Sequence, residues 1–347
     1  MGEIRLAVAG VGNCCSSLVQ GIQYYRNGGA DGLLHDEVGG YGVSDVKFVA
    51  AFDVDARKVG LDLSEAIFSE PNKVSHIVEM PKLDVEVQMG SLLDDLVSDS
   101  EGVVVVSDAS PVDVVGALRE ARADILVNLV SGSALESSKF YAEAAEDAGC
   151  GFINATPSPV VHEAGVADRF AGSGLPLVGD DLLDQIGATV VHIGLLEFLH
   201  GRGIHIDESY QLDVGGGAES VNTLWKTREL KRKIKTTAVS GAVPYEFPLV
   251  SGSTDYVDFL GNSRDSFFWF KGRYFGGAPF TMDAKLSTVD AHNAGAILLD
   301  VIRGVKLAKD RGQGGALQPL CAYGFKRPPE RLPLIEAYKL FKEFVKA

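Results

Sequence analysis

Residues 7–22 read AVAGVGNCCSSLVQGI, in which a short apolar strand runs into a glycine turn and then into a helix. In this context a glycine turn binds a pyrophosphate through backbone N–H groups and the positive end of the helix. Gly10 and Gly12 are the glycines that this chemistry requires, and Cys15 takes the third position of the usual GxGxxG pattern, where another small residue still allows close helix packing. The stretch therefore predicts a dinucleotide site. The residues expected to bind the pyrophosphate are Gly10, Gly12, Asn13, Cys14, Cys15 and Ser16.

Short runs of apolar, β-branched residues alternate with helical stretches through the first half of the chain. Continuous apolar runs suit strands that are buried on both faces of a parallel sheet. A helix is expected at 137–148, before a stop at Gly149. The alternation predicts an α/β fold with a doubly wound, Rossmann-like parallel sheet. The expected strands are 5–9, 47–52, 103–107, 125–129, 152–154 and 175–178.

The second expected strand ends in FDVD at 52–55, where a carboxylate can accept hydrogen bonds from the adenosine ribose and repel a 2′-phosphate. Asp53 therefore favours NAD over NADP. It lies farther from the glycines than the usual spacing of about 20 residues, and a glycine-rich insert at 24–44 accounts for the excess. The alternative is that Asp53 and Asp55 are ordinary turn residues at the end of a strand.

Small polar residues follow several other expected strands, and strand ends line the cofactor crevice in such folds. Ordinary turn residues would look much the same. The further candidates on the cofactor side are Asp108, Ser110, Ser133 and Asp180. The candidates for substrate contacts are Asn154, Asp181 and Lys306.

From about residue 204 the sequence changes to alternating segments such as IHIDESYQLDV (204–214) and SFFWFKGRYFG (266–276), which predict half-buried antiparallel strands. Beyond residue 293 a helix resumes and is expected to pack back onto the first domain. The predicted division is 1–200 for the NAD-binding domain, 201–290 for a second, sheet-rich α+β domain, and 291–347 for a C-terminal helical segment.

The composition is that of an ordinary globular protein, with 347 residues, 46% hydrophobic residues and a net charge of −15. Such acidity argues against a general nucleic-acid binder, which needs a basic surface. The cysteines show no CxxC spacing, so no metal site is expected. The sequence has no apolar run of about 18 residues and no signal peptide. We therefore expect a soluble cytoplasmic protein with no membrane partner.

Residues 226–235 (KTRELKRKIK) form a basic island in this acidic chain. An island of positive charge focuses a small anion such as a phosphate ester, whereas a solvated helix face is the ordinary alternative. Helical phasing also places Lys309 on one stripe with Leu298, Ile302 and Val305. An inward lysine is costly unless it meets a partner or a substrate; the alternative is a helix-end lysine that reaches solvent near the C-terminal dipole.

Over nearly its whole length the chain resembles the myo-inositol-1-phosphate synthase family of the short bacterial type. Several of the matching segments are long and specific, so a fold-level analogy is a poor explanation. The segments are GVGNCCSSLVQGIQYY (10–25), DVKFVAAFDVDARKVGLDLSEAIF (45–68), KFYAEAAEDAG (139–149), PLVGDDLLDQIGATVVH (176–192), LDVGGGAESVNTL (212–224), KIKTTAV (233–239) and VIRGVKLAKDRGQGG (301–315).

The resemblance implies an enzyme that uses tightly held NAD⁺ without net redox change. Such enzymes oxidise C5 of open-chain glucose 6-phosphate, remove a proton from C6, close the ring on C1 and return the hydride. Lysines stabilise the charge that develops on oxygen, and the resemblance assigns this catalytic role to Lys235 and Lys309. It also implies that the sheet-rich domain is catalytic and pairs subunits in a homotetramer or a dimer.

The chain departs from the family pattern at the substrate end. Leu183 holds a position that normally carries a lysine, Gly217 and Glu219 replace Asn and Asp, and Asn262 stands with Arg264 where an acidic and basic pair is expected. These departures favour an altered substrate. Fructose 6-phosphate would undergo the same oxidation and deprotonation and then close on C2, giving a five-membered cyclitol phosphate.

Three other functions stay open. The nearest is orthodox synthesis of inositol phosphate from glucose 6-phosphate. A simple NAD-dependent sugar-phosphate dehydrogenase would instead accumulate free NADH as substrate is consumed. A protein that only senses NAD or a sugar phosphate would bind its ligand without turnover, although retention of Lys235 and Lys309 argues against loss of catalysis.

Overall fold

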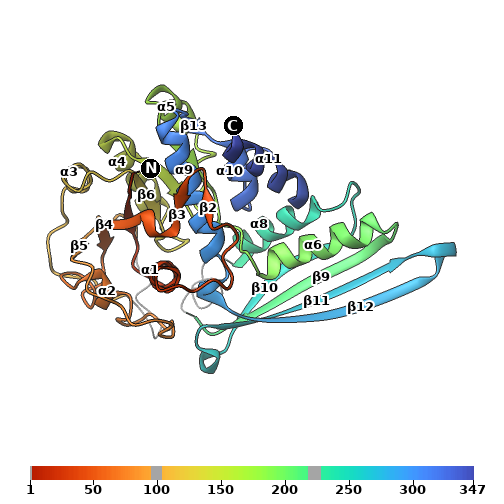
Figure 1. Ribbon diagram of the computed structural model, residues 1–347. Helices are drawn as coiled ribbons and strands as arrows, with labels where there is room; N and C mark the ends of the chain where they lie inside the picture. Colours follow the sequence, from red (N-terminus) through yellow and green to blue (C-terminus); the bar gives the residue numbers. More distant parts are fainter. Residues whose placement is uncertain (1, 95–103, 218–227) are drawn as a thin grey trace.

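The computed structural model describes residues 2–94, 104–217 and 228–347. Within these ranges the strands form a seven-stranded sheet, a four-stranded sheet and a two-stranded hairpin. The two larger sheets lie in different parts of the molecule, and the long strands of the four-stranded sheet project away from the rest (Figure 1). Glu219, one of the departures from the family pattern, and the start of the basic island at 226–227 lie outside the described residues.

The seven-stranded sheet is parallel throughout and has the order β13-β8-β7-β6-β1-β4-β5. The chain winds in one direction from β1 to β4 and β5, and in the other from β6 to β8. The switch between β1 and β6 creates the crevice in which such folds bind ligands, so the doubly wound α/β prediction is confirmed. The strands are β1 (Ile4–Ala9), β4 (Val46–Asp53), β5 (Val87–Met89), β6 (Ile125–Asn128), β7 (Gly151–Asn154), β8 (Pro176–Val178) and β13 (Gly315–Ala316).

The apolar runs are continuous because both faces of this sheet are covered. In β1, Leu6 and Val8 join one buried core cluster, while Ala7 and Ala9 join a second cluster on the opposite face. One face is covered mainly by α1 (Asn13–Arg26), α9 (Gly295–Asp310), α10 (Gln318–Gly324) and α11 (Leu334–Lys346), with the short α2 (Leu63–Ala66) nearby. The other is covered by α3 (Val114–Glu120), α4 (Leu135–Ala148) and α5 (Val166–Gly172).

The predicted strand at 103–107 is wrong for its described part. Residues 104–107 contribute only an isolated antiparallel bridge between Asp55 and Val106. Val105 and Val106 are 53% and 41% exposed, so this valine-rich run lacks the buried surroundings that a central strand requires. The position beside β4 is taken by β5 instead, a strand too short to stand out in the sequence.

The insert at 24–44 is fixed to the sheet domain. It contains the hairpin of β2 (Glu37–Val38) and β3 (Tyr41–Gly42), followed by a 3-10 turn, η1 (Val43–Asp45). Arg303 of α9, fully buried, donates to the carbonyl oxygens of His35 and Asp36 and pairs with Asp300 at 2.6 Å. The insert therefore packs against α9, on the side of the sheet away from α3 and α4.

The four-stranded sheet has the order β10-β9-β11-β12. Strand β11 is antiparallel to both neighbours, as the alternating pattern predicts, whereas β10 runs parallel to β9. On one face, α6 and α8 bury Leu196, Val239 and Phe268 against the sheet. The elements are α6 (Ala188–Gly201), β9 (His205–Gly215), α8 (Arg228–Ser240), β10 (Leu249–Tyr256), η3 (Asp258–Leu260), β11 (Ser263–Arg273), η4 (Phe275–Gly277), β12 (Pro279–Val289) and η5 (Asp290–His292).

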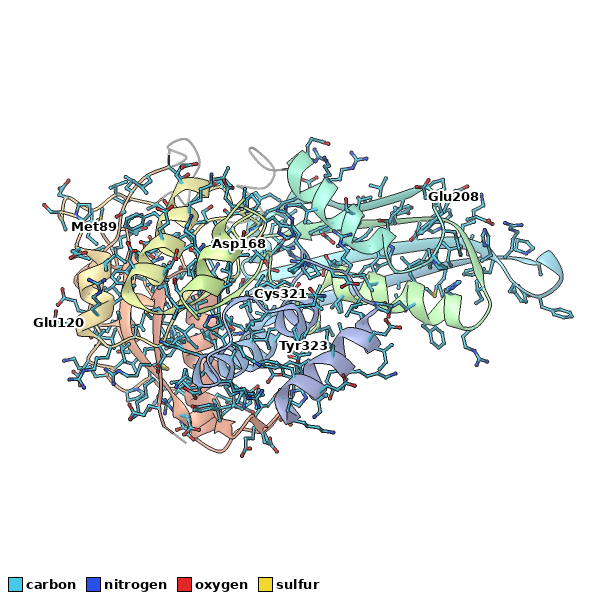
Figure 2. All side chains as sticks on the ribbon, turned by 90° about the horizontal axis from the view of Figure 1, so that it is seen from above. Met89, Glu120, Asp168, Glu208, Cys321 and Tyr323 are labelled. Atoms are coloured by element: carbon cyan, nitrogen blue, oxygen red, sulfur yellow. The ribbon has the colours of Figure 1, made fainter. Side chains whose placement is uncertain are left out.

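The C-terminal helices lie between the two sheets. Figure 2 shows Tyr323 and Cys321 of α10 between Met89 of the first sheet and Glu208 of the second. Leu298 and Ile302 of α9 belong to the core of the first sheet, whereas α6, which ends at residue 201, packs on the second. The domain boundaries from the sequence stay a prediction.

Candidate functional site

The glycine turn connects β1 to α1 at the switch point of the parallel sheet. Gly10 has a φ of +92°, and a Cβ atom there would lie 2.7 Å from the carbonyl carbon of Leu129, so this position requires glycine. At Gly12 a Cβ atom would meet nothing within 4 Å among the described residues. The first glycine thus allows β1 and β6 to approach, and the second leaves open space in front of the helix.

The first turn of α1 is suited to an anion. The N-cap residue of this 14-residue helix is Gly12, which makes no side-chain cap hydrogen bond, so the positive end of the helix dipole faces this turn without a capping side chain from that residue. Asn13 accepts a hydrogen bond from the Lys73 backbone and Cys14 is exposed. Cys15 and Ser16 are buried in the domain, and burial raises the pKa of the Cys15 thiol. Asn13 and Cys14 therefore lie at the surface of the turn, while Cys15 and Ser16 support it.

Asp53 lies at the end of β4 and is tied to the glycine turn. Its carboxylate accepts hydrogen bonds from the backbone N–H groups of Val11, at 2.6 Å, and of Val54 and Asp55, at 2.7 and 3.0 Å. Lys58 is buried with its ammonium 3.9 Å from the same carboxylate. The structure thus brings Asp53 to the turn, where a dinucleotide ribose would lie in such a fold.

The remaining cofactor candidates are dispersed. Asp108 and Ser110 are exposed and follow the segment that does not form a strand. Ser133 is half-buried in the turn after β6, with its hydroxyl 3.1 Å from that of Ser131. Ser133 therefore lies near the carboxyl edge of the sheet, while Asp108 and Ser110 follow a bridge beyond β4.

Asn154 and Asp180 meet in a buried hydrogen-bond network at the carboxyl ends of β6, β7 and β8. The Asn154 amide donates to Asp180 at 2.7 Å and accepts from Asn128 at 3.0 Å. Asp180 also accepts from the Val161 backbone and lies 3.0 Å from Nδ1 of His162. The Asn128 Oδ1 atom is buried without a donor in the described part of the chain. A ligand amide at this edge would satisfy that acceptor.

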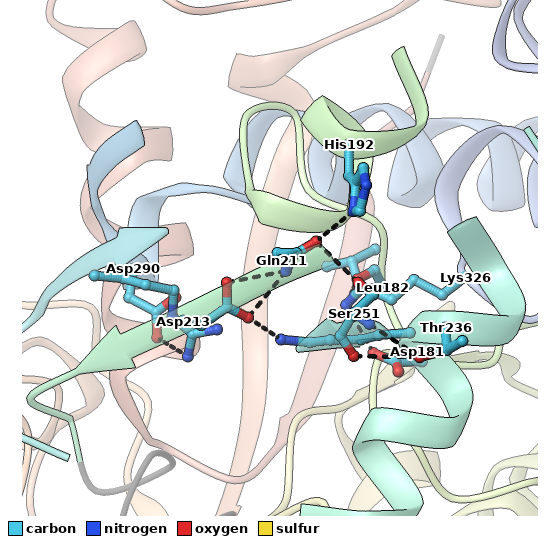
Figure 3. Close-up of polar contacts among 11 residues, drawn as sticks. Asp181, Leu182, His192, Gln211, Asp213, Thr236, Ser251, Asp290 and Lys326 are labelled. Atoms are coloured by element: carbon cyan, nitrogen blue, oxygen red, sulfur yellow. Dashed lines mark hydrogen bonds and ion pairs between the residues drawn. The ribbon is translucent and has the colours of Figure 1, made fainter. Parts of the chain in front are cut away.

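Three ion pairs, contributed by both sheet regions, lie close together beside this edge (Figure 3). Lys235 donates to Asp213 at 2.7 Å, and Lys326 donates to Asp181 at 3.0 Å and to the Leu182 carbonyl at 2.9 Å. Arg264 pairs with Asp290 at 2.9 Å. We call these six side chains the charged cluster: Asp181, Asp213, Lys235, Arg264, Asp290 and Lys326.

The charged cluster adjoins the glycine turn. Ser17 of α1 lies with its hydroxyl 2.6 Å from Nδ1 of His292, in the same 3-10 turn, η5, that carries Asp290. The Lys73 ammonium donates to the carbonyl of Gly216, just after β9. These contacts place the cluster and the dinucleotide turn on neighbouring sides of one site.

Burial and like charge act together on the cluster. Burial lowers the pKa of Lys235, with smaller contributions from Arg264 and Lys326, and Asp213 opposes this change. Burial also opposes the charge of Lys326, but Asp181 and Asp184 outweigh it and raise the pKa of Lys326. Burial raises the pKa of Asp184, which faces both Lys326 and Arg264. The site thus holds one lysine, Lys235, and one carboxyl group, that of Asp184, shifted toward their neutral forms, and a second lysine, Lys326, held in its charged form.

The structure does not bring Lys309 or Lys306 to this cluster. The Lys309 ammonium donates to the carbonyl of Asp124 at 2.9 Å, and that of Lys306 lies 3.9 Å from the Asp124 carboxylate and pairs with Asp310. Asp124 immediately precedes β6, so both lysines lie at the amino ends of the parallel strands. The spacing of residues along α9 correctly predicted which face of the helix points inward, but it did not predict which edge of the sheet Lys309 reaches.

The basic island divides between two environments. Arg232 and Lys233 are exposed on α8, as the solvated-face alternative predicts, while Lys235 has a side chain only 12% exposed and reaches Asp213. Leu183 is 5% exposed and lines a pocket of about 90 Å³ with Ile193, Ala238 and other residues. Position 183 therefore contributes apolar packing between α6 and α8.

Sequence reasoning missed Lys326 and Asp213. Lys326 precedes a proline pair in a loop, and no local pattern marks it. Asp213 carried a signal, since it falls on the inward face of the alternating strand with Gln211 and Ser209. An inward carboxylate at such a position requires a buried partner.

Two features are absent from the residues that the structure describes. No group of three or more histidine, cysteine, aspartate or glutamate side chains in them is arranged to hold a metal ion. None of their helices combines the length and apolar character that a membrane span requires.

Comparison with known proteins finds relatives along the whole chain. The family described as myo-inositol-1-phosphate synthase matches residues 187–291. A protein of Mycolicibacterium smegmatis named inositol-3-phosphate synthase is 43% identical over 343 residues, covering 95% of this chain and 94% of that protein. The crystal structure of Ari2 is similar at a TM-score of 0.80 and 31% identity, covering 99% and 100% of the two chains. A myo-inositol-1-phosphate synthase-related protein from Thermotoga maritima has a TM-score of 0.84 at 23% identity, covering 99% and 98%, and supports the fold alone.

Proposed function

The chain belongs to the myo-inositol-1-phosphate synthase family, and from this premise we propose that it is an isomerase that uses NAD⁺ to cyclise a hexose 6-phosphate without net redox change. The favoured substrate is fructose 6-phosphate, which would give a five-membered cyclitol phosphate. The orthodox reaction of glucose 6-phosphate is the second candidate, because relatives at 43% and 40% identity are named inositol-3-phosphate synthase.

The observation that carries this proposal is the meeting of Lys235, Arg264 and Lys326 beside the glycine turn. These cations come from both domains: within the described residues the ammonium groups of Lys235 and Lys326 bind carboxylate and carbonyl oxygens, and Arg264 pairs with Asp290. An anionic substrate between the domains would meet all three. A guanidinium such as that of Arg264 suits a phosphate, and ammonium groups suit oxygen atoms that become negative.

The glycine turn and Asp53 fit a dinucleotide. The open space at Gly12, the uncapped α1 and the orphaned acceptor of Asn128 supply a place for pyrophosphate and a nicotinamide-side acceptor. Asp53 would hold the adenosine ribose. The chemistry that a bound NAD⁺ would supply at this site is reversible hydride transfer at C5 of the substrate.

The residues of this chain supply the remaining steps. Once C5 is a ketone, the proton on C6 becomes acidic, and Lys235 and Lys326 stabilise the negative charge on the C5 oxygen. Asp184 has Lys326 and Arg264 of the charged cluster as charged neighbours, and burial raises the pKa of its carboxyl group, so we assign to it the acceptance of the C6 proton. The C6 carbon then attacks the C2 carbonyl of fructose 6-phosphate, and the proton passes to that carbonyl oxygen. The proton that the C5 hydroxyl group loses on oxidation returns to the C5 oxygen on reduction, together with the hydride at C5, so the reaction is an isomerisation.

The preference for fructose 6-phosphate rests on the departures at 183, 217 and 262. Leu183 packs among apolar side chains where the family pattern has a cation, so one positive charge fewer faces the substrate. We propose that the loss of this charge changes the position of the carbon chain of the substrate. Lys326 and Lys235 are the cations that remain to stabilise the negative charge of the enolate.

The decisive experiment incubates the purified protein and NAD⁺ with fructose 6-phosphate and, separately, with glucose 6-phosphate, and follows products by ³¹P and ¹³C NMR. A cyclopentane phosphate from fructose 6-phosphate supports the favoured substrate. Inositol phosphate from glucose 6-phosphate alone overturns it and supports the second candidate. NADH that accumulates in step with substrate loss would indicate a dehydrogenase and overturn the cyclisation.

We further propose that the chain forms a homotetramer, with a dimer as the alternative, through the outer face of the second sheet. Leu212 and Phe267 on that face are 41% and 40% exposed, and Tyr210 stacks on Trp269 with ring centroids 5.4 Å apart. Exposed apolar side chains in a row indicate an interface. Light scattering should give the mass of an oligomer, and Phe267→Asp should reduce it.

A further inference from the structure

Asp213 occupies a buried position that was not expected to hold a charge. Its side chain has no exposed surface and lies on the inner face of β9. One carboxylate oxygen accepts from Lys235 at 2.7 Å, and the two oxygens accept from the Gln211 amide at 2.9 and 3.0 Å. Both oxygens therefore have partners, and the direction of the carboxylate is fixed.

Gln211 is fixed in turn by residues from two neighbouring elements, β10 and α6. Its Oε1 atom accepts from the Ser251 hydroxyl of β10 at 2.9 Å and lies 3.2 Å from Nδ1 of His192 on α6. His192 also lies 2.8 Å from the Ser209 hydroxyl of β9. Because Oε1 is occupied in this way, the Gln211 amide nitrogen points at Asp213. Figure 3 shows this chain of contacts running from His192 to Asp213.

Lys235 meets charged groups from several elements. Asp213 of β9 favours its charged form, while Arg264 of β11 and Lys326 of the loop after α10 oppose it. Arg264 is itself paired with Asp290, and Lys326 with Asp181, and Asp184 faces both cations. Asp213 is therefore the acidic partner that holds Lys235 against burial and two neighbouring positive charges.

We propose that Asp213 is a positioning residue for the cyclisation, which keeps the Lys235 ammonium charged and directed at the substrate oxygen, and that Gln211 holds Asp213 in place. The inference rests on the proposed function, in which Lys235 stabilises the charge that develops on the C5 oxygen. Asp213 acts through Lys235 and does not itself exchange a proton with the substrate.

A purely structural role for Asp213 predicts a different result. If the carboxylate only stabilised the fold, an isosteric amide would reduce activity equally at every pH, or leave it unchanged. If it maintains the charge of Lys235, the amide moves the pH at which Lys235 loses its proton to lower values. The shift expected on removal of an opposite charge at this range is about one pH unit or more.

The test compares the native protein, Asp213→Asn, Asp213→Glu and the control Asp207→Asn. Asp207 lies on the same strand but pairs with Arg273 near the far end of β9, outside the charged cluster. In each protein the titration of Lys235 is followed through its ¹³Cε resonance in lysine-labelled protein, assigned with Lys235→Arg. The pH profiles of kcat and kcat/KM are then recorded with the hexose 6-phosphate that turns over.

Asp213→Asn should shift both the Lys235 titration and the alkaline limb of kcat to lower pH by the same amount. Asp213→Glu should restore part of the shift, and Asp207→Asn should show none. An unchanged Lys235 titration in Asp213→Asn, or an alkaline limb that does not move with it, would overturn the inference. Because the titration needs no turnover, failure of the native protein to convert either sugar phosphate would refute the proposed function and still leave the pairing of Asp213 with Lys235 tested.

Discussion

The ammonium of Lys235 lies 2.7 Å from the Asp213 carboxylate, and these side chains are 12% and 0% exposed. One residue comes from α8 and the other from β9, so the pair joins a helix to the sheet that it covers. A buried charge is costly when its partner is removed, whereas removal of both charges costs much less. The pair can therefore be examined separately as a stabilising contact and as a source of positive charge for the reaction.

Lys235→Met should lower both the stability and the turnover of the protein. The double variant Lys235→Met with Asp213→Asn should recover most of the stability but none of the turnover. The single variant leaves Asp213 buried without its ammonium partner, at a cost of about 3–5 kcal/mol. Loss of a donor that stabilises transition-state charge should reduce kcat by about 10²-fold or more in both variants. Urea unfolding and kcat measure the two effects. Equal stability of the single and double variants would show that the pair is not a coupled buried unit.

Lys326→Ala should reduce kcat by about 10²-fold with little change in NAD⁺ affinity, because Lys326 reaches Asp181 in the charged cluster. Lys309→Ala should change kcat by about threefold or less, because its ammonium contacts Asp124 at the other edge of the sheet. Steady-state kinetics and calorimetric NAD⁺ titration separate these effects. A larger loss of kcat in Lys309→Ala than in Lys326→Ala would return the catalytic role to Lys309.

The contrast between these lysines shows what could be predicted from the sequence and what required the tertiary structure. Apolar runs such as 5–9 identified strands because burial on both faces leaves a local pattern. The stripe of α9 correctly indicated which helix face is buried, but the edge of the sheet reached by Lys309 depends on tertiary placement. Lys326 became a candidate only when its loop was seen beside Asp181.

The two parts of the site also differ in how far they could be predicted from the sequence. The glycine turn and Asp53 form around one strand–turn–helix unit and its neighbouring strand, so they could be predicted from the sequence. The charged cluster is assembled from two domains, and its members are separated by long stretches of chain. The run at 103–107 shows the opposite limit, because an apolar run predicts a strand only where neighbouring elements bury it.

Gly10→Ala and Gly12→Val should fail in different ways. At Gly10 the added Cβ atom would lie 2.7 Å from the backbone of Leu129 at a φ of +92°, so the variant should lose about 1–3 kcal/mol of stability. At Gly12 the described surroundings leave space for a side chain, so Gly12→Val should unfold at nearly the native temperature but bind NAD⁺ at least tenfold more weakly. Thermal unfolding without NAD⁺ and calorimetric titration provide the comparison. Native NAD⁺ affinity in Gly12→Val would place the pyrophosphate elsewhere.

His192 should make stability depend on pH below neutrality. Burial lowers the pKa of His192 from 6.5 to about 4, so between these values the unfolded chain binds a proton that the native protein does not. Stability from this group therefore rises with pH through the window from about 4 to 6.5, and the penalty at the acidic end is about 3 kcal/mol. His192→Gln removes the titrating group, so its unfolding free energy should fall less between pH 7 and pH 4.5 than that of the native protein. The matched control is His205→Gln, which replaces a histidine that is 49% exposed on β9 and leaves His192 in place. Urea unfolding at several pH values gives these differences. If the unfolding free energy of the native protein and of His192→Gln falls equally between pH 7 and pH 4.5, His192 is protonated in the folded state over this range and its contact with Gln211 is a charged one.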